Sequence, residues 1–284
     1  MSLLTTQARA LLRPGQTPAA TPSPTGSPAR PFVPGTAARL AADLATSGRQ
    51  RLADAAAADG GMARLLAAVG TAQLLQSSSL AAAAGAPDPA AARLGPVPAV
   101  QSPAAGSCPA ATASPSAAPF RSSASAAADS GLPDSGLPGA DLPDALAALV
   151  RTELETVYGY QVALTRLDDA AARSAAAQLA RHEALVTAAE ALSRLHCAPV
   201  PPREPGYALD PSFLAAPGPG LGALEAASLP AYGDLVALSD GETRKWAISG
   251  LLGAARRTVL WGAAPGPVPG LDADPASFPT LPAD

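Results

Sequence analysis

Residues 144–164 read DALAALVRTELETVYGYQVAL, and this stretch decides the fold. Its seam residues recur at alternating steps of four and three, as Leu146, Val150, Glu153, Val157, Tyr160, Leu164 and, just beyond, Leu167. This spacing places them in one stripe along an α-helix, and such stripes pack against each other in helical bundles. Asp141 precedes the stretch and can cap the helix. The pattern therefore predicts a long bundle helix that begins near Asp141.

A second helix is expected from Asp168 or Asp169 to Cys197. The prolines at 199, 201 and 202 stop it, because proline has no N–H for the helical hydrogen bond. Its stripe contains Ala175, Leu179, His182, Val186, Ala189 and Ser193. An irregular crossover at 198–218 follows.

Two more helices complete the pattern. The third opens after Gly220, bends at Pro230 and carries Leu221, Leu224, Glu225, Ser228, Tyr232, Leu235 and Val236. The fourth opens at Ser239, which forms a Ser-x-x-Glu capping box with Glu242, and buries Trp246, Ile248, Leu251, Leu252, Ala255 and Val259. A short, a long and a short connection between four helices is the topology of a ferritin-like four-helix bundle. The expected fold class is all-α.

Proline divides the rest of the chain. Residues 1–35, with seven prolines, are expected to be a disordered arm, and residues 36–84, which have apolar spacings of three and four around Gly60 and Gly61, a helical hairpin. Residues 85–140 return to Pro, Ala, Ser and Gly and predict a disordered linker. The bundle occupies 141–263, and a Pro-rich tail follows at 264–284.

Charge and cysteine content narrow the function classes. The 19 Lys and Arg against 23 Asp and Glu give a net charge of −4, which argues against a nucleic-acid partner. No apolar run is long enough for a membrane span, and Arg9 and Arg13 interrupt any signal segment. We therefore expect a cytoplasmic protein, or an exported one if the true start lies upstream. Cys108 and Cys197 are expected to be free thiols.

The bundle region resembles a known family over residues 145–271. The resemblance rests on ALVRTELETVYGYQVAL at 148–164, ARHEALVTAAEAL at 180–192, PPREPGYAL after it, ETRKWAISGLLGAARRTVLWG at 242–262 and PGPVPGL at 265–271. These pieces are similar to the ferritin-like domain of unknown function that is widespread in high-GC actinobacteria. The resemblance implies the fold but no activity, and it places the family's polar positions at Glu153, His182, Glu225 and Arg244.

Three of these residues suggest a metal centre. A di-iron site in this fold takes one Glu from each of two helices and a Glu-x-x-His motif from each of the other two. Glu153, His182 and Glu225 could hold at most one weakly bound divalent metal, because Leu179 replaces the glutamate of the first motif. The fourth helix offers neither Glu nor His in its interior. No other cofactor is expected.

The alternative is a buried hydrogen-bonded network of Glu153, His182, Glu225 and Arg244 that holds the helices in register. Arg244 would supply a fixed positive charge where metals would otherwise sit. The pair Arg256 and Arg257 lies near a helix C-terminus, where the helix dipole favours cations.

Two functions follow. The first is a non-catalytic binding or interaction module with a degenerate metal centre, whose partner is an unknown protein or a second copy of the chain. The second is a ferritin-like metal-binding or redox protein that uses Glu153, His182 and Glu225. No residue is assigned a catalytic role, and we expect a protein that is not an enzyme.

Overall fold

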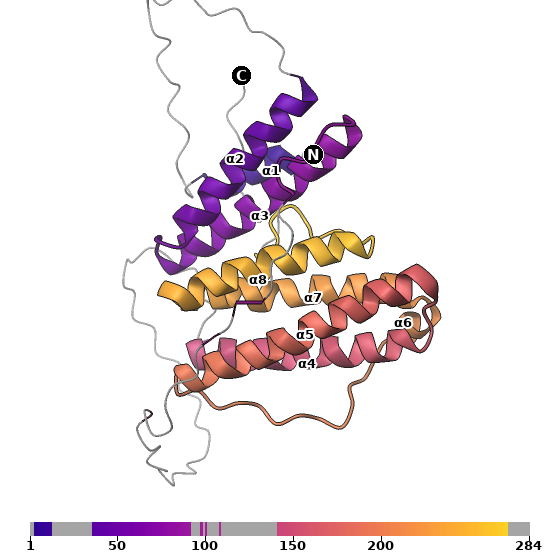
Figure 1. The fold of residues 1–284 in the computed structure, drawn as a ribbon. Helices are drawn as coiled ribbons and strands as arrows, with labels where there is room; N and C mark the ends of the chain where they lie inside the picture. The colour runs from indigo at the N-terminus through magenta and orange to yellow at the C-terminus, as the bar shows by residue number, and fades with distance from the viewer. Residues whose placement is uncertain are drawn as a thin grey trace, which may run out of the picture.

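The computed structural model describes residues 3–12, 36–91, 97, 98, 100, 108 and 141–271. Within these residues the chain forms eight helices and no strand (Figure 1). The all-α fold class is confirmed, and so are the hairpin and the four long helices that follow it.

The bundle consists of α4 (Leu142–Leu164), α5 (Asp169–Leu195), α7 (Pro217–Leu238) and α8 (Gly241–Leu260). The carboxylate of Asp141 caps α4 by accepting the Asp144 N–H at 3.0 Å, as its position predicts. Helix α4 packs on α5 and α7, and α7 packs on α8, so the bundle has two layers (Figure 1). The buried core between the layers is built from side chains such as Leu146, Leu149, Tyr232, Leu235 and Leu251.

Helices α5 and α8 close the bundle less tightly, because they make almost no close backbone approach to each other. The groove between them is occupied by part of the expected linker. Val97 and Val100 pack against the main core cluster, and Pro98 lies with them between side chains of both helices. Val97, Pro98 and Val100 therefore take the place of direct packing between α5 and α8.

Two local features of the bundle differ from expectation. The crossover contains a short helix, α6 (Pro211–Ala215), whose Phe213 is buried. The capping box at the start of α8 does not form, because the Ser239 hydroxyl donates to the Leu235 carbonyl at the end of α7. Asp240 is the N-cap residue of α8, and its side chain makes no capping hydrogen bond.

The hairpin consists of α2 (Ala37–Ala55) and α3 (Gly60–Ala83). A Cβ on Gly48 would lie 2.9 Å from the Gly70 carbonyl oxygen, so glycine at this crossing lets the two backbones approach closely. The hairpin packs through α3 on α7 and α8. Among the described residues, α3 is the one helix long and apolar enough to cross a membrane, but 56% of its apolar window is buried inside the protein. Core helices commonly share this composition.

Both ends of the described chain dock at the hairpin, whereas an arm and a loose tail were expected. Helix α1 (Leu3–Ala10) lies within the segment expected to be disordered, and Gln7 Nε2 donates to the Pro267 carbonyl at 3.2 Å. Val268 is buried against α3, and Arg64 Nε donates to the Gly270 carbonyl at 2.8 Å. The remainder of the expected arm, 1–2 and 13–35, and of the tail, 272–284, lies outside the described residues.

Cys108 and Cys197 form a disulfide, with their Cα atoms 5.5 Å apart, so the expectation of two free thiols is wrong. The pair is separated by 89 residues, and nothing local in the sequence indicates that the fold brings them together. The bond fixes one point of the segment 85–140 to the end of α5. Most of the other residues in that segment are outside the described part, so the expectation of a disordered linker stays a prediction.

Candidate functional site

The structure brings together three of the four predicted polar residues in the bundle core. Glu153 on α4, His182 on α5 and Glu225 on α7 each have no exposed surface. His182 lies between the two carboxylates, with Nδ1 2.7 Å from Glu153 Oε2 and Nε2 2.8 Å from Glu225 Oε1. The helical spacings that place these residues in the seam therefore also place them at one height in the bundle.

Each carboxylate also accepts a hydrogen bond from one buried tyrosine, on α7 for Glu153 and on α4 for Glu225. Tyr232 donates its hydroxyl hydrogen to Glu153 Oε1 at 2.6 Å, and Tyr160 donates to Glu225 Oε1 at 2.6 Å. Trp261, just beyond α8, donates its indole N–H to the Tyr160 oxygen at 2.7 Å. The hydrogen bonds therefore run from the edge of the bundle inward to the two carboxylates.

The positive charge beside Glu225 is Arg257, and the prediction of Arg244 in the network is wrong. Arg257 is 1% exposed, and its Nε donates to both oxygens of Glu225, at 2.9 and 2.8 Å. Arg244 lies 13 residues earlier on α8, roughly 20 Å along the helix axis. There its Nε donates to the Ser239 carbonyl at 2.6 Å and its Nη1 to the Ala58 carbonyl, so it ties the hairpin to the bundle.

Sequence reasoning missed Arg257 because a basic pair near a helix end resembles an exposed cap. A signal was nevertheless present in the spacing. Arg257 follows Trp246, Gly250 and Ala254 at intervals that keep all four on one face of α8, and the other three are buried. An arginine on an apolar stripe indicates a buried partner of opposite charge.

The residues of the cluster shift one another's pKa values. Burial alone would lower the pKa of His182, but the carboxylates of Glu153 and Glu225 outweigh it and raise that pKa. Burial would likewise raise the pKa of Glu225, but Arg257 and His182 outweigh it and lower that pKa. Burial and the neighbouring carboxylates raise the pKa of both tyrosines. The two carboxylates therefore lie against the His182 ring and the Arg257 guanidinium, and these contacts offset part of the cost of burying them.

The same geometry does not fit a metal ion. Both ring nitrogens of His182 are already engaged by carboxylates, and a metal would need at least one of them with its lone pair free. Both oxygens of Glu225 already accept a hydrogen bond from Arg257 Nε. Among the described residues there is no group of three or more His, Cys, Asp or Glu arranged to hold a metal ion.

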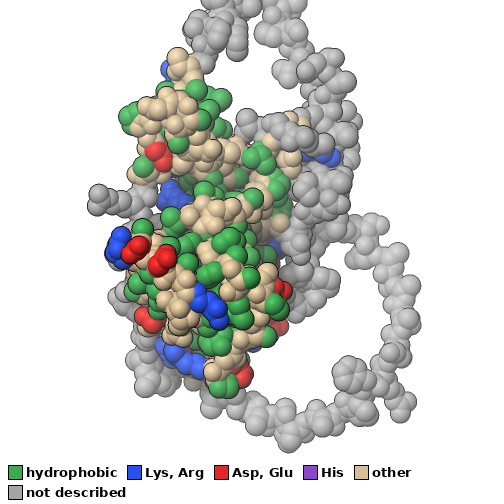
Figure 2. Space-filling view, turned by 90° about the vertical axis from the view of Figure 1, so that its right-hand side faces the viewer, with side chains coloured by type: hydrophobic (Ala, Val, Ile, Leu, Met, Phe, Trp, Pro, Cys, Tyr) green, Lys and Arg blue, Asp and Glu red, His purple; other side chains and the backbone are tan. Residues whose placement is uncertain are grey.

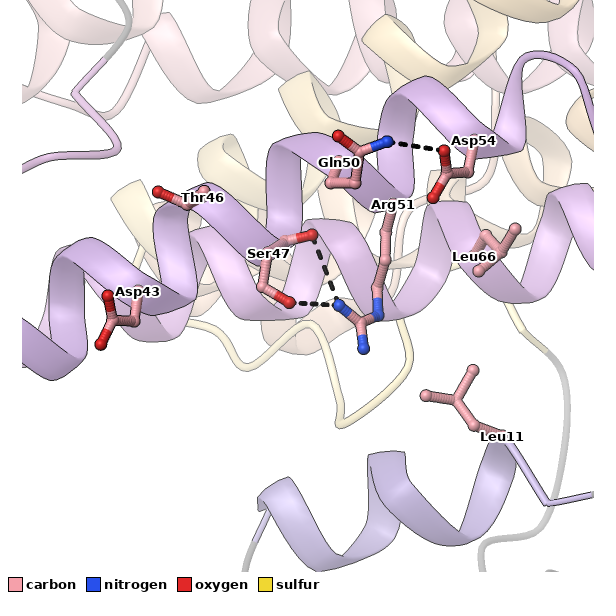
Figure 3. A pocket seen from close by; sticks show the side chains of 8 residues that line it. All are labelled: Leu11, Asp43, Thr46, Ser47, Gln50, Arg51, Asp54 and Leu66. Carbon is pink, nitrogen blue, oxygen red and sulfur yellow. Dashed lines mark hydrogen bonds between the residues drawn. The ribbon is translucent and has the colours of Figure 1, made fainter. Parts of the chain in front are cut away.

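The surface offers no second site of comparable chemistry among the residues that the structure describes. A polar pocket of about 580 Å³ lies between the end of α1 and the outer face of α2, with Leu11 and Leu66 at its edge (Figure 3). Its polar groups are paired locally: Gln50 donates to Asp54 at 2.8 Å, and Arg51 donates to Ser47 (Figure 3). On the face shown in Figure 2, Lys and Arg side chains are scattered among hydrophobic ones and form no continuous basic patch within the described part.

Fold and site together define an all-helical protein whose four-helix bundle contains a buried polar cluster. Residues 145–273 match a family model described as a domain of unknown function, DUF4439, and the match covers less than half of the chain. No curated protein and no solved structure matches the chain.

Proposed function

We propose that this chain is a non-catalytic, ferritin-like interaction protein with a degenerate metal centre. The observation that supports the proposal is the saturation of Glu153 and Glu225 by donors of the chain itself, namely Tyr160, His182, Tyr232 and Arg257. Carboxylates engaged in this way leave no oxygen open to a metal or substrate, whereas a reactive metal centre needs an open coordination position.

The cluster can be compared, helix by helix, with the ligand set of a di-iron site in this fold. Helices α4 and α7 each supply their glutamate, Glu153 and Glu225. Helix α5 keeps the histidine of Glu-x-x-His but has Leu179 three residues before it, and α8 has Ala254 and then Arg257 at the same spacing. The guanidinium of Arg257 thus stands where the histidine of the second motif would be a metal ligand. It supplies a fixed positive charge in place of the charge of a metal ion.

Metal analysis tests this proposal directly. Protein purified without chelator should contain much less than one iron, zinc or manganese per chain, and its thermal midpoint should not change with EDTA. Mass spectrometry of the elements and differential scanning fluorimetry supply the two readings. Two irons per chain, absent from the Glu153→Gln variant, would contradict the proposal and support the alternative metal-binding or redox function of Glu153, His182 and Glu225.

The interaction half of the proposal rests on the groove between α5 and α8. That groove already accepts apolar residues of the chain itself, with Pro98 and Val100 lining a hollow of about 430 Å³ together with Leu192, Leu195 and Trp246. We infer that an extended, proline-containing peptide of a partner or of a second copy is the kind of ligand the groove fits.

A peptide experiment tests this inference. The double variant Val97→Ser, Val100→Ser should have a lower thermal midpoint, because two partly buried apolar contacts to the core are lost. A synthetic peptide with the sequence of residues 92–103 should restore the midpoint, and a scrambled peptide should not. Equal midpoints with both peptides would show that the groove does not accept peptides in trans.

The disulfide bears on the compartment. We infer that the protein works in an oxidising compartment, because disulfides persist there and are reduced in the cytosol. This favours the exported alternative over the cytoplasmic one.

A further inference from the structure

A short motif occurs twice in this chain, as GPVPAV at 95–100 and as GPVPGL at 266–271. Each copy reads Gly-Pro-Val-Pro, then a small residue, then a branched aliphatic residue. We call them the first and the second copy of the motif. The first copy precedes the bundle helices in the chain and the second follows them, so the two can be compared as separate ligands of the helical core.

The second copy is anchored by two apolar side chains. Val268 is buried against Ala68 and Val69 of α3, and Leu271 packs on the same core cluster. The Leu271 N–H donates to the Val268 carbonyl at 3.1 Å, so a turn brings both side chains to that cluster. Aliphatic residues three positions apart therefore dock this copy.

Buried side chains also hold the main chain of the second copy. Arg64 Nε donates to the Gly270 carbonyl at 2.8 Å, and Gln7 Nε2 donates to the Pro267 carbonyl at 3.2 Å. The two prolines of the motif have no N–H, so its main chain has more acceptors than donors. A site for this motif therefore needs an apolar surface and a side-chain donor for a carbonyl.

The α5–α8 groove has both features around the first copy. Val97 and Val100 pack against one core cluster and have the same spacing as the apolar pair of the second copy. Trp246 lines the groove with Pro98 and is 6% exposed, and its Nε1 has no acceptor among the residues that the structure describes. A buried N–H without an acceptor is unfavourable, and an indole N–H can only donate. The groove therefore holds a donor that suits a ligand's carbonyl.

The first copy fills its groove less completely than the second copy fills its own site. Val97 and Val100 are only partly buried and Pro98 is exposed, whereas residues 268–270 are all buried. A hollow of about 430 Å³ remains beside Pro98 and Val100. Another copy of the motif can therefore displace residues 97–100 at the cost of a few partly buried contacts.

We propose that the α5–α8 groove recognises partner proteins by the sequence Val-Pro-x-Val or Val-Pro-x-Leu. The two aliphatic side chains of the partner take the positions of Val97 and Val100, and Trp246 Nε1 donates to one of its main-chain carbonyls. Residues 97–100 of the chain itself act as a weak internal competitor. The inference rests on the proposed peptide groove and specifies its ligand.

Binding of synthetic peptides to the full chain tests the motif. Peptides of residues 92–103 and 263–274, which contain the first and second copies, should bind the Val97→Ser, Val100→Ser variant with affinities within about three-fold of each other, because they share their anchors. Serine at both aliphatic positions of either peptide should weaken binding at least about ten-fold, since two apolar contacts are lost. The native chain should bind both peptides more weakly than the variant does. Isothermal titration calorimetry measures these affinities.

A groove variant tests the donor. Trp246→Phe keeps an aromatic ring but removes one hydrogen bond, so it should weaken binding of both peptides about five-fold. Ser249→Ala is the matched control, because this exposed hydroxyl on α8 also lines the groove but donates to the Lys245 carbonyl. It should leave both affinities unchanged. If Trp246→Phe does not fold, the serine-substituted peptides still decide the proposal.

The outcomes separate this inference from the proposed function. Binding of the 92–103 peptide that is insensitive to its serine substitutions, or no binding of the 263–274 peptide, would overturn the motif and leave the peptide groove in place. Undiminished binding by Trp246→Phe would overturn the assigned donor. If neither peptide binds, the groove and the motif both fail.

Discussion

Nε of Arg257 bridges both carboxylate oxygens of Glu225, at 2.9 and 2.8 Å, and so joins α8 to α7 through the bundle interior. Both side chains are almost completely buried. A buried pair of this kind adds little relative to apolar residues of the same shape, but removing one member leaves the other charge uncompensated.

Glu225→Gln should therefore lower the free energy of unfolding by about 3 to 5 kcal/mol, because it leaves Arg257 and His182 without their common carboxylate. Urea titration followed by circular dichroism measures the change. The control is Glu242→Gln, which removes an exposed ion pair with Lys245 and should cost about 0 to 1 kcal/mol. Equal costs for the two variants would show that Glu225 is solvated.

A pair of double-mutant cycles should separate the two arginines of α8. Glu225→Gln combined with Arg257→Gln should show an interaction free energy of about 0.5 to 3 kcal/mol, because the residues are in contact. Glu153→Gln combined with Arg244→Gln should be additive within about 0.5 kcal/mol, since Arg244 bonds the carbonyls of Ser239 and Ala58 instead. Additivity in the first cycle would contradict the ion pair.

Stability should depend on pH through His182 and Glu225. The folded-state pKa of His182 is raised above 6.5, so its contribution is complete below pH 6.5 and is lost as the pH rises through the folded value. The pKa of Glu225 is lowered from 4.5, so its contribution is complete above pH 4.5 and is lost as the pH falls through the lowered value.

Thermal midpoints should therefore be highest between about pH 4.5 and 6.5 and decline on the alkaline side. His182→Gln should remove the alkaline decline, whereas His196→Gln should leave it in place. A profile for His182→Gln that parallels the native profile would assign the decline to another group.

Gly250 faces the ring of Tyr232, and a Cβ at this position would overlap that ring. Gly250→Ala should therefore displace Tyr232 from Glu153 and cost about 1 to 3 kcal/mol. A Cβ on Gly218 of α7 would meet no atom within 4 Å, so Gly218→Ala is the matched control and should be neutral or slightly stabilising. Comparison of the two unfolding midpoints checks the close approach of α7 and α8.

The disulfide makes a separate prediction. Protein denatured without reductant should contain no free thiol, since both cysteines are paired. Cys197→Ser should lower the free energy of unfolding by about 2 to 4 kcal/mol, because the bond restricts a long loop of the unfolded chain. Detection of two free thiols per chain by a colorimetric thiol assay would contradict the pairing.

The helices were predictable because each depends on local signals. The three- and four-residue spacing of Leu146, Val150 and Glu153 fixes the buried face of α4, and Asp141 marks its start. The meeting of Glu153 with His182 follows from the same spacing, since two seam residues on antiparallel neighbours can share a height in the bundle. Glu225 was predictable in the same way.

Features that depend on tertiary contact were not predictable. The spacing of Arg257 on the buried stripe of α8 indicates a buried partner, but that this partner is Glu225 depends on how α7 packs against α8. The docking of Val97 in the α5–α8 groove and the pairing of Cys108 with Cys197 depend on contacts between residues far apart in the sequence. The proline-rich composition around these residues carries no information on which distant residues they contact.

The bond between Cys108 and Cys197 has a consequence for how this chain can be taken apart. It closes a covalent ring that runs from residue 108 through α4 and α5 to residue 197, with α2 and α3 attached before the ring and α7 and α8 after it. A single backbone cut between 109 and 140 opens the ring but leaves the two fragments linked through sulfur. Separating the fragments of such a cut therefore takes two chemically different events, proteolysis and reduction, and neither alone is sufficient.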